Sequence, residues 1–130
     1  MKKMNKLMLI VLLIVIMTIS AGCNHVNASQ GGVSMSAEEA LSLWQAQEAV
    51  IIDVRTLKEY QEGHIPDAPL IPLDQLESRL DEIPKEQKVL LICRSGRRSA
   101  QGTSLLRSKG FEQVINIEGG MLAWRGPVVK

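Results

Sequence analysis

The sequence predicts an α/β fold with a mostly parallel central sheet. Short β-branched runs that are apolar on both faces, the pattern of buried parallel strands, alternate with segments of helical periodicity. The chain has 15 Lys and Arg against 14 Asp and Glu over 130 residues, a balance that suits one globular domain. That balance and an aromatic content of 3% give no indication of a nucleic-acid partner.

The N-terminal segment has the order of a secretory signal: a basic start, an apolar run at 7–19 and then small residues. The apolar run is shorter than the roughly 20 residues that span a bilayer. Residues 20–23 (SAGC) resemble a bacterial lipobox. This resemblance implies that 1–22 form a signal peptide and that Cys23 is lipidated. The protein would then be an extracytoplasmic lipoprotein, anchored to the bacterial cell membrane.

Two alternatives for the N-terminus stay open. The apolar run could remain as an uncleaved anchor, or ordinary cleavage after Ala28 could release a secreted or periplasmic protein. Residues 23–32 are small and polar and end in a glycine pair, which predicts a flexible tether. The folded domain is therefore expected at 33–130, long enough for one modest core.

The elements of this domain are expected in alternating order. Ser36 and Glu39 form a capping-box pattern ahead of a helical stripe that reaches Ala46. Further helices are expected at 57–62, 74–83, 99–109 and 121–125, strands at 49–54, 88–93 and 114–117, and a short extended segment at 69–73. Pro84 would stop the second of these helices, and Gly110 would cap the third.

A reactive cysteine is expected where the middle strand ends. Cys93 closes that strand, Arg94 to Arg98 follow, and Ser99 opens a helix. Parallel sheets place functional groups at the carboxyl ends of strands. Loop amides, the helix N-terminus and three arginines all favour an anion there. We therefore expect a lowered pKa for Cys93 and an exposed thiolate able to act as a nucleophile. The alternative is an inert, buried cysteine.

The order of motifs along the domain resembles that of rhodanese-family sulfurtransferases. The strongest match is the loop at 93–99 (CRSGRRS), which resembles the active-site loop of the family. The first family signature is matched by DVR at 53–55, EY at 59–60 and GHIP at 63–66, and the last by GF at 110–111 and GG at 119–120 followed by Trp124. The resemblance implies a three-layer sandwich with helices on both faces of the sheet.

The activity that the resemblance implies is sulfur transfer through a Cys93 persulfide. A small donor such as thiosulfate would load the cysteine, and cyanide or a thiol would unload it, with no metal or other cofactor. The donor would be bound by the loop residues Arg94, Ser95, Gly96, Arg97, Arg98 and Ser99. Asp53 and Arg55 are interpreted as a structural ion pair that braces this loop. His64 is assigned a packing or hydrogen-bonding role, because a thiolate needs no base.

Three alternative functions come from other classes. A cysteine phosphatase or arsenate reductase of related fold would need an arginine at the sixth position after Cys93, where this chain has Ser99. A non-catalytic interaction module would usually lack the cysteine. A sulfur carrier or redox thiol that serves a partner protein fits the loop as well as the enzyme does, and its acceptor would distinguish it.

Overall fold

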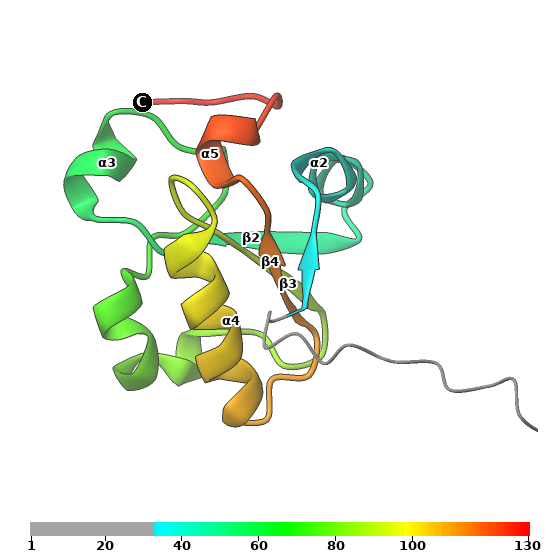
Figure 1. Ribbon diagram of the computed structural model, residues 1–130, viewed down its shortest axis with the longest axis vertical. Coiled ribbons are helices and arrows are strands. Elements are labelled where there is room, and N and C mark those ends of the chain that lie inside the picture. The colour runs from blue at the N-terminus through cyan, green and yellow to red at the C-terminus, as the bar shows by residue number, and fades with distance from the viewer. Residues whose placement is uncertain (1–32) are drawn as a thin grey trace, which may run out of the picture.

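The computed structural model describes residues 33–130, and Figure 1 shows their arrangement. The predicted signal peptide, the lipidation site at Cys23 and the tether lie outside the described residues. Within 33–130, no helix has the length and apolar character needed to cross a membrane.

Strands and helices alternate along the domain as the sequence predicts. The strands are β1 (Ser34–Met35), β2 (Ala49–Asp53), β3 (Lys88–Ile92) and β4 (Val114–Ile117). The α-helices are α2 (Ala37–Gln45), α3 (Leu57–Gln61), α4 (Arg97–Ser108) and α5 (Gly120–Ala123), and two 3₁₀ helices are η1 (Leu73–Ser78) and η2 (Leu80–Glu82). The four strands form one parallel sheet in the order β1-β4-β3-β2.

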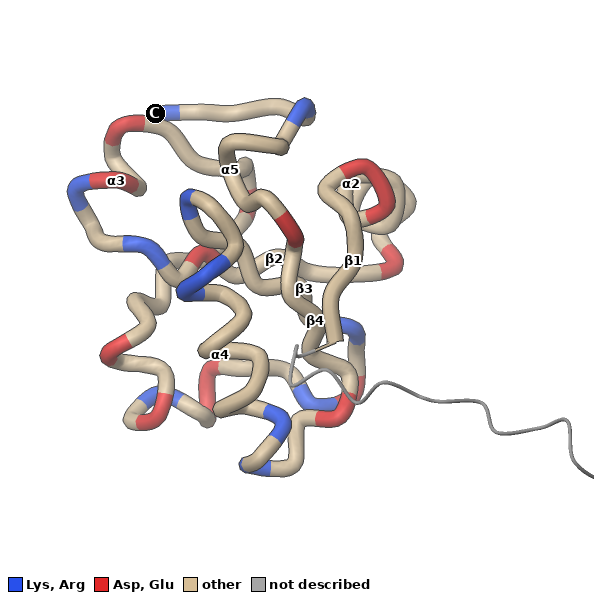
Figure 2. Tube along the Cα trace, viewed as in Figure 1, with Lys and Arg blue, Asp and Glu red and all other residues tan. Residues whose placement is uncertain are grey.

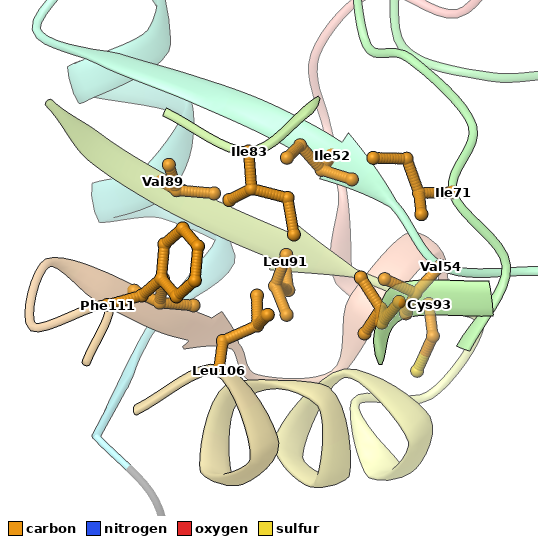
Figure 3. Packing of buried hydrophobic residues seen from close by; sticks show 11 residues of the cluster. Ile52, Val54, Ile71, Ile83, Val89, Leu91, Cys93, Leu106 and Phe111 are labelled. Carbon is orange, nitrogen blue, oxygen red and sulfur yellow. The ribbon is translucent and has the colours of Figure 1, made fainter. Parts of the chain in front are cut away.

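Helices cover both faces of the sheet, so the expected three-layer architecture is confirmed (Figure 1). Neighbouring residues of β2 point to opposite faces: Ile52 packs with Leu106 of α4 and Leu76 of η1, whereas Ile51 packs with Ala40 of α2. Burial of both faces explains why the strands read as continuous apolar runs. Figure 3 shows the α4 side of this core, with Cys93 at its edge beside Val54.

The helix ends follow the predicted capping chemistry. Ser36 and Glu39 form both bonds of a capping box at the start of α2. Gly110 follows α4 with φ of +93°, and its N–H donates to the carbonyl of Arg107 while that of Phe111 donates to Leu106. This pair of bonds is a Schellman motif, which requires the left-handed conformation that glycine adopts freely.

Four details of the predicted elements are wrong. The expected helix at 74–83 is two 3₁₀ helices, because Arg79 has φ of −125° and ψ of 30° and interrupts the helical path. Strand β1 was missed because two residues are too short to show a period. Helix α4 begins at Arg97 rather than at Ser99. Helix α5 ends at Ala123, since Trp124 has extended backbone.

The segment at 69–73 lies beside β2, as an extended segment should. Asp53 and Leu70 form an isolated parallel bridge, and the N–H of Ile71 donates to the carbonyl of Asp53 over 2.9 Å. This segment leads from α3 back to η1 along the edge of the sheet, so it fixes where α3 lies relative to the end of β3.

Candidate active site

Cys93 lies immediately after β3, at the carboxyl end of the sheet. Its Sγ accepts a hydrogen bond from the N–H of Gly96 over 3.0 Å and one from the hydroxyl of Ser99 over 3.3 Å. The backbone N–H groups of Ser95 and Ser99 also stabilise the charged sulfur and so lower the pKa of the thiol. The loop therefore surrounds one sulfur atom with donors, and we call residues 93–99 the sulfur cradle.

The sulfur takes the place of a helix N-cap for α4. The N-cap residue, Gly96, has φ of +93° and no side chain to accept from the free N–H groups of the first turn. Ser99 is the third residue of α4, the position whose N–H an N-cap side chain ordinarily satisfies. Because the N–H of Ser99 stabilises the thiolate of Cys93, the positive end of the helix dipole is directed at the sulfur.

These donors lower the pKa of Cys93 below its usual value. Burial of the thiol raises its pKa, but the hydroxyl of Ser99 and the backbone N–H groups of Ser99, Gly96 and Ser95 more than offset that effect. The expected lowering is thus present, and the predicted loop amides are among its main causes. The hydroxyl of Ser99 is a further cause that the sequence analysis did not name. Of the three arginines, Arg98 has an electrostatic interaction with Cys93.

The expectation of an exposed thiolate is wrong for this conformation. Cys93 has an exposed fraction of 0%, because its side chain turns into the cradle, whereas Arg94 and Ser95 are exposed above it. Cys93 is a free thiol.

Helix α5 holds the cradle in place through backbone contacts. The N–H of Met121 donates to the carbonyl of Cys93 over 2.8 Å, and that of Leu122 donates to the carbonyl of Arg94 over 3.1 Å. A trans peptide points its carbonyl and its N–H to opposite sides. Holding the Arg94 carbonyl against α5 therefore turns the N–H of Ser95 away from α5, where it serves the sulfur.

Gly120 makes this close approach possible. It has φ of +53°, and a Cβ there would lie 2.3 Å from the carbonyl oxygen of Cys93. Any side chain would push the cradle away from α5 or unwind the turn. The sequence predicts a tight turn at 119–120. It does not predict that this turn lies against Cys93, which only the folded structure shows.

Arg98 is held by Glu59, a residue to which the sequence analysis assigned no role. Its Nη1 and Nη2 donate to Glu59 on α3 over 2.8 and 2.7 Å. This bond pair with Arg98, together with bonds from Thr56, lowers the pKa of Glu59 to about 2, although partial burial opposes the shift. The pair ties α3 to the first turn of α4. Two signals in the sequence marked this carboxylate without giving its partner: its place in the EY motif at 59–60 and the capping-box pattern that it forms with Thr56.

The other two arginines of the loop differ from Arg98. Arg94 and Arg97 are exposed, and neither forms an ion pair with any residue in 33–130. Of the three arginines that are candidates for binding an anion, Arg94 and Arg97 are therefore the two without a carboxylate partner in the described domain.

Asp53 and Arg55 form the predicted ion pair, with 2.7 Å between Nη2 and Oδ2 and exposed fractions of 0% and 6%. Arg55 also donates to the carbonyl of Gly63 over 2.7 Å. The pair therefore braces the turn after α3, and it acts on the cradle indirectly, through the position of α3. His64 stacks on Tyr60 with ring centroids 3.7 Å apart, and its Nδ1 lies 2.9 Å from the carbonyl of Tyr60.

The surface near the cradle carries a groove of about 290 Å³, whose lining includes Arg55, Arg98, Pro72 and Leu73. A larger cavity of about 450 Å³ lies at the opposite end of β2, around Trp44 and Ala49. The smaller groove is the relevant one, because it adjoins the residues that contact the cradle. In the described part of the chain, no three His, Cys, Asp or Glu side chains are grouped as metal ligands would be.

A family model for the rhodanese-like domain matches residues 36–127. A sulfurtransferase of Allochromatium vinosum is 40% identical over 88 residues, which cover 66% of this chain and 82% of that protein. The putative sulfur carrier protein YrkF of Bacillus subtilis is 41% identical over 76 residues, covering 58% of this chain and 41% of that protein. A human single-domain sulfurtransferase structure superposes with a TM-score of 0.67 and 30% identity, covering 72% of this chain and 96% of that one.

A cysteine cradled at the end of a parallel strand, in a fold shared with these proteins, defines the class of the molecule. The chain belongs to the rhodanese-like domain family. The relatives support sulfur transfer as its general chemistry and a rhodanese-type enzyme as its general class.

Proposed function

We propose that the protein is a sulfurtransferase that moves a sulfane sulfur from thiosulfate, or a similar small donor, to cyanide or a thiol through a Cys93 persulfide. The observation that carries the proposal is the set of donors around Sγ, from Ser99, Gly96 and Ser95. They favour the thiolate, which is the nucleophilic form of cysteine. The Allochromatium and human relatives named sulfurtransferases support the same chemistry.

The reaction has two displacements. In the first, the Cys93 thiolate attacks the outer sulfur of thiosulfate, the sulfur–sulfur bond of the donor breaks, and sulfite leaves with the electron pair. In the second, cyanide or a thiolate attacks the terminal sulfur of the persulfide, and the electron pair returns to Cys93. The persulfide anion is stabilised by the same inward N–H groups, as an oxyanion is in acyl transfer.

The loop residues have distinct roles in this proposal. Arg94 and Arg97 bind the sulfonate oxygens of the donor, because arginine forms charge-assisted bonds to oxyanions and these two have no competing carboxylate in the described domain. Ser95, Gly96 and Ser99 supply donors to the sulfur. Arg98 stays with Glu59 and helps to place the start of α4.

Intact mass tests the persulfide directly. The full chain in mild detergent is incubated with thiosulfate, desalted and weighed, beside its Cys93→Ser and Cys23→Ser variants. We expect a gain of one sulfur atom in the wild type and in Cys23→Ser, which cyanide removes, and no gain in Cys93→Ser. Folded protein with a free Cys93 that gains no sulfur would contradict the proposal.

A second candidate is a sulfur carrier that serves a partner protein. The similarity to the putative sulfur carrier YrkF favours it, as does the complete burial of Cys93, which restricts access. The acceptor distinguishes the two: a carrier discharges its persulfide slowly to cyanide and small thiols and quickly to one protein. A phosphatase is disfavoured by Ser99, whose hydroxyl contacts the sulfur where such an enzyme needs an arginine, and we expect no hydrolysis of an aryl phosphate.

For location, we propose a lipoprotein anchored outside the cytoplasm through Cys23. The basic start, the apolar run and the small residues before Cys23 support this proposal. Several hydrophobic chains on one cysteine would hold the domain stably at a membrane. Metabolic labelling of the chain with an alkyne fatty acid in a bacterial host tests it, since label should enter the wild type and be absent from Cys23→Ala. Equal labelling of both would refute the assignment.

A further inference from the structure

Three segments surround the sulfur cradle and form one continuous surface with it. Helix α3 lies on one side, joined to Arg98 through Glu59. Helix α5 lies on the other, joined to the carbonyls of Cys93 and Arg94. The C-terminal tail that follows α5 returns to α3, where Val129 and His64 form an antiparallel bridge. We call the residues 57–64, 94–98 and 118–130 the active-site rim (Figure 1).

Exposed apolar side chains are concentrated on this rim. Of the five large apolar residues that are exposed in 33–130, four belong to it: Leu57 at 58%, Leu122 at 58%, Val128 at 50% and Val129 at 43%. The fifth, Val33, precedes β1 at 46%. Scattered apolar residues need no explanation, but a group around a reactive centre marks a contact surface. A small inorganic donor makes no use of such residues.

The rim is positively charged, whereas the rest of the domain is negative. It holds six Lys and Arg (Lys58, Arg94, Arg97, Arg98, Arg125, Lys130) and three Glu (Glu59, Glu62, Glu118), a net side-chain charge of +3. The remainder of 33–130 holds six Lys and Arg against eleven Asp and Glu, a net of −5. Figure 2 shows basic segments at the cradle loop and near the C-terminus, whereas α3 carries both basic and acidic segments. Complementary charge steers partners to a surface and selects among them.

We propose that the active-site rim docks an acidic protein that presents a thiol to Cys93 and removes its sulfur. This inference rests on the proposed persulfide chemistry and names the class of its acceptor. The acceptor thiolate attacks the terminal sulfur of the persulfide, the bond between that sulfur and Sγ breaks, and the electron pair returns to Cys93. The acceptor leaves as a persulfide, so electrons and atoms balance without an oxidant.

The apolar side chains favour a protein over a bilayer as the occupant. They come from three separate segments beside the cradle, α3, α5 and the C-terminal tail, and not from one face of a long helix. A membrane pressed on all three segments would close the cradle to water-soluble donors. A protein contact can be made and broken between loading and unloading. The groove lined by Thr56, Leu73 and Arg98 also offers a concave surface at the start of α3.

Direct binding tests the docking independently of sulfur transfer. The probe is a fluorescent peptide with Glu and Leu around a serine, and its matched control carries Lys in place of each Glu. Binding to the full chain in mild detergent is followed by fluorescence anisotropy at low and high salt. We expect the acidic peptide to bind roughly tenfold or more tightly than the basic one, and salt to remove the difference.

Variants locate the binding on the rim. Lys58→Glu combined with Arg125→Glu should abolish the preference for the acidic peptide, whereas the control pair Lys85→Glu and Lys88→Glu, with the same charge change elsewhere, should keep it. Val128→Ser should weaken binding several-fold, and Val33→Ser should not. None of these side chains contacts the sulfur, so persulfide formation should be unchanged in all of them.

The kinetic readout uses the same peptides with cysteine at the central serine. The acidic cysteine peptide should discharge the persulfide faster than the basic one, by a margin that the Lys58 and Arg125 substitutions remove. Equal binding of both peptides would overturn the proposal. A second result would also overturn it: the chain binds anionic vesicles but not neutral ones, this binding depends on Lys58 and Arg125, and the acidic peptide is not preferred. Failure to form a persulfide would count against the proposed function, while the binding result still decides the docking.

Discussion

Glu59 and Arg98 join α3 to α4 through two hydrogen bonds, although 39 positions separate them in the chain. One oxygen of the same carboxylate also accepts from the N–H and the hydroxyl of Thr56, so it caps α3 at the same time. A single acidic side chain therefore sets both the start of α3 and the orientation of the first turn of α4, which holds the sulfur.

Substitution Glu59→Gln should lower the stability at neutral pH by about 1 kcal/mol, the upper end for partly exposed ion pairs. Because the folded pKa of Glu59 is depressed to about 2, its contribution is complete above pH 4.5 and is lost as pH falls towards 2. Urea unfolding across this range should give a steeper loss in wild type than in the variant. Glu39→Gln is the matched control, since Glu39 caps α2 without an arginine. Parallel profiles for wild type and Glu59→Gln would contradict the pairing.

Substitution Ser99→Ala should raise the pKa of Cys93, because it removes the hydroxyl that donates to Sγ and leaves the backbone donors. The rate at which iodoacetamide alkylates Cys93 is measured as a function of pH. In Ser99→Ala the midpoint of this profile should lie at a higher pH than in wild type, and below neutral pH the rate should be several-fold slower. Thr103→Val is the control, since its hydroxyl donates to the carbonyl of Ser99 and not to sulfur. An unchanged Ser99→Ala profile would show that the hydroxyl has no part in thiolate stabilisation.

Substitution Gly120→Ala should disable the site by displacing the cradle, since the new Cβ would meet the carbonyl of Cys93. Misplacement of reacting groups by about 1 Å reduces turnover about a hundredfold. Gly110→Ala is a close control: Gly110 also has positive φ, but nothing lies within 4 Å of the added Cβ. Its variant should lose about 1 kcal/mol of stability and keep the Cys93 alkylation profile. Equal turnover in the two variants would argue against the role of α5.

Substitutions Arg94→Ala and Arg97→Ala should each raise the KM for thiosulfate about tenfold, the effect of losing one charge-assisted bond. Arg98→Ala should instead destabilise the domain, because its guanidinium is engaged with Glu59. Arg79→Ala removes a partly buried charge that is paired with Glu82 of η2, and it should leave the KM unchanged. Steady-state kinetics with thermal melts separates these outcomes, and a wild-type KM in both loop variants would remove them from donor binding.

Local patterns in the sequence account for most of the fold. Apolar runs at 49–54 and 88–93 predict buried strands, and the capping box at Ser36 predicts the start of α2, since each depends on near neighbours alone. The helix at 74–83 could not be predicted correctly, because its apolar spacing fits both an α-helix and two 3₁₀ turns that bury Leu76 and Ile83.

The candidate site is predictable in its chemistry and not in its geometry. Strand, loop glycine and helix start around Cys93 indicate an anion site, and the lowered pKa agrees with that expectation. The burial of Cys93, the pairing of Arg98 with Glu59 and the contact of Met121 with the Cys93 carbonyl depend on how distant segments pack. No local pattern encodes such contacts.

Because the sulfur of Cys93 caps α4, the thermal stability of the domain reports the chemical state of that atom. A thiolate accepts from the first turn of the helix; a neutral, alkylated sulfur accepts weakly, and a persulfide moves the charge one atom outward. A modification of the sulfur that removes the cap should thus lower the melting temperature, and one that retains the cap should leave it nearly unchanged. Calorimetry could follow sulfur loading without a label, and small molecules that occupy the cradle would be found by the same thermal signal.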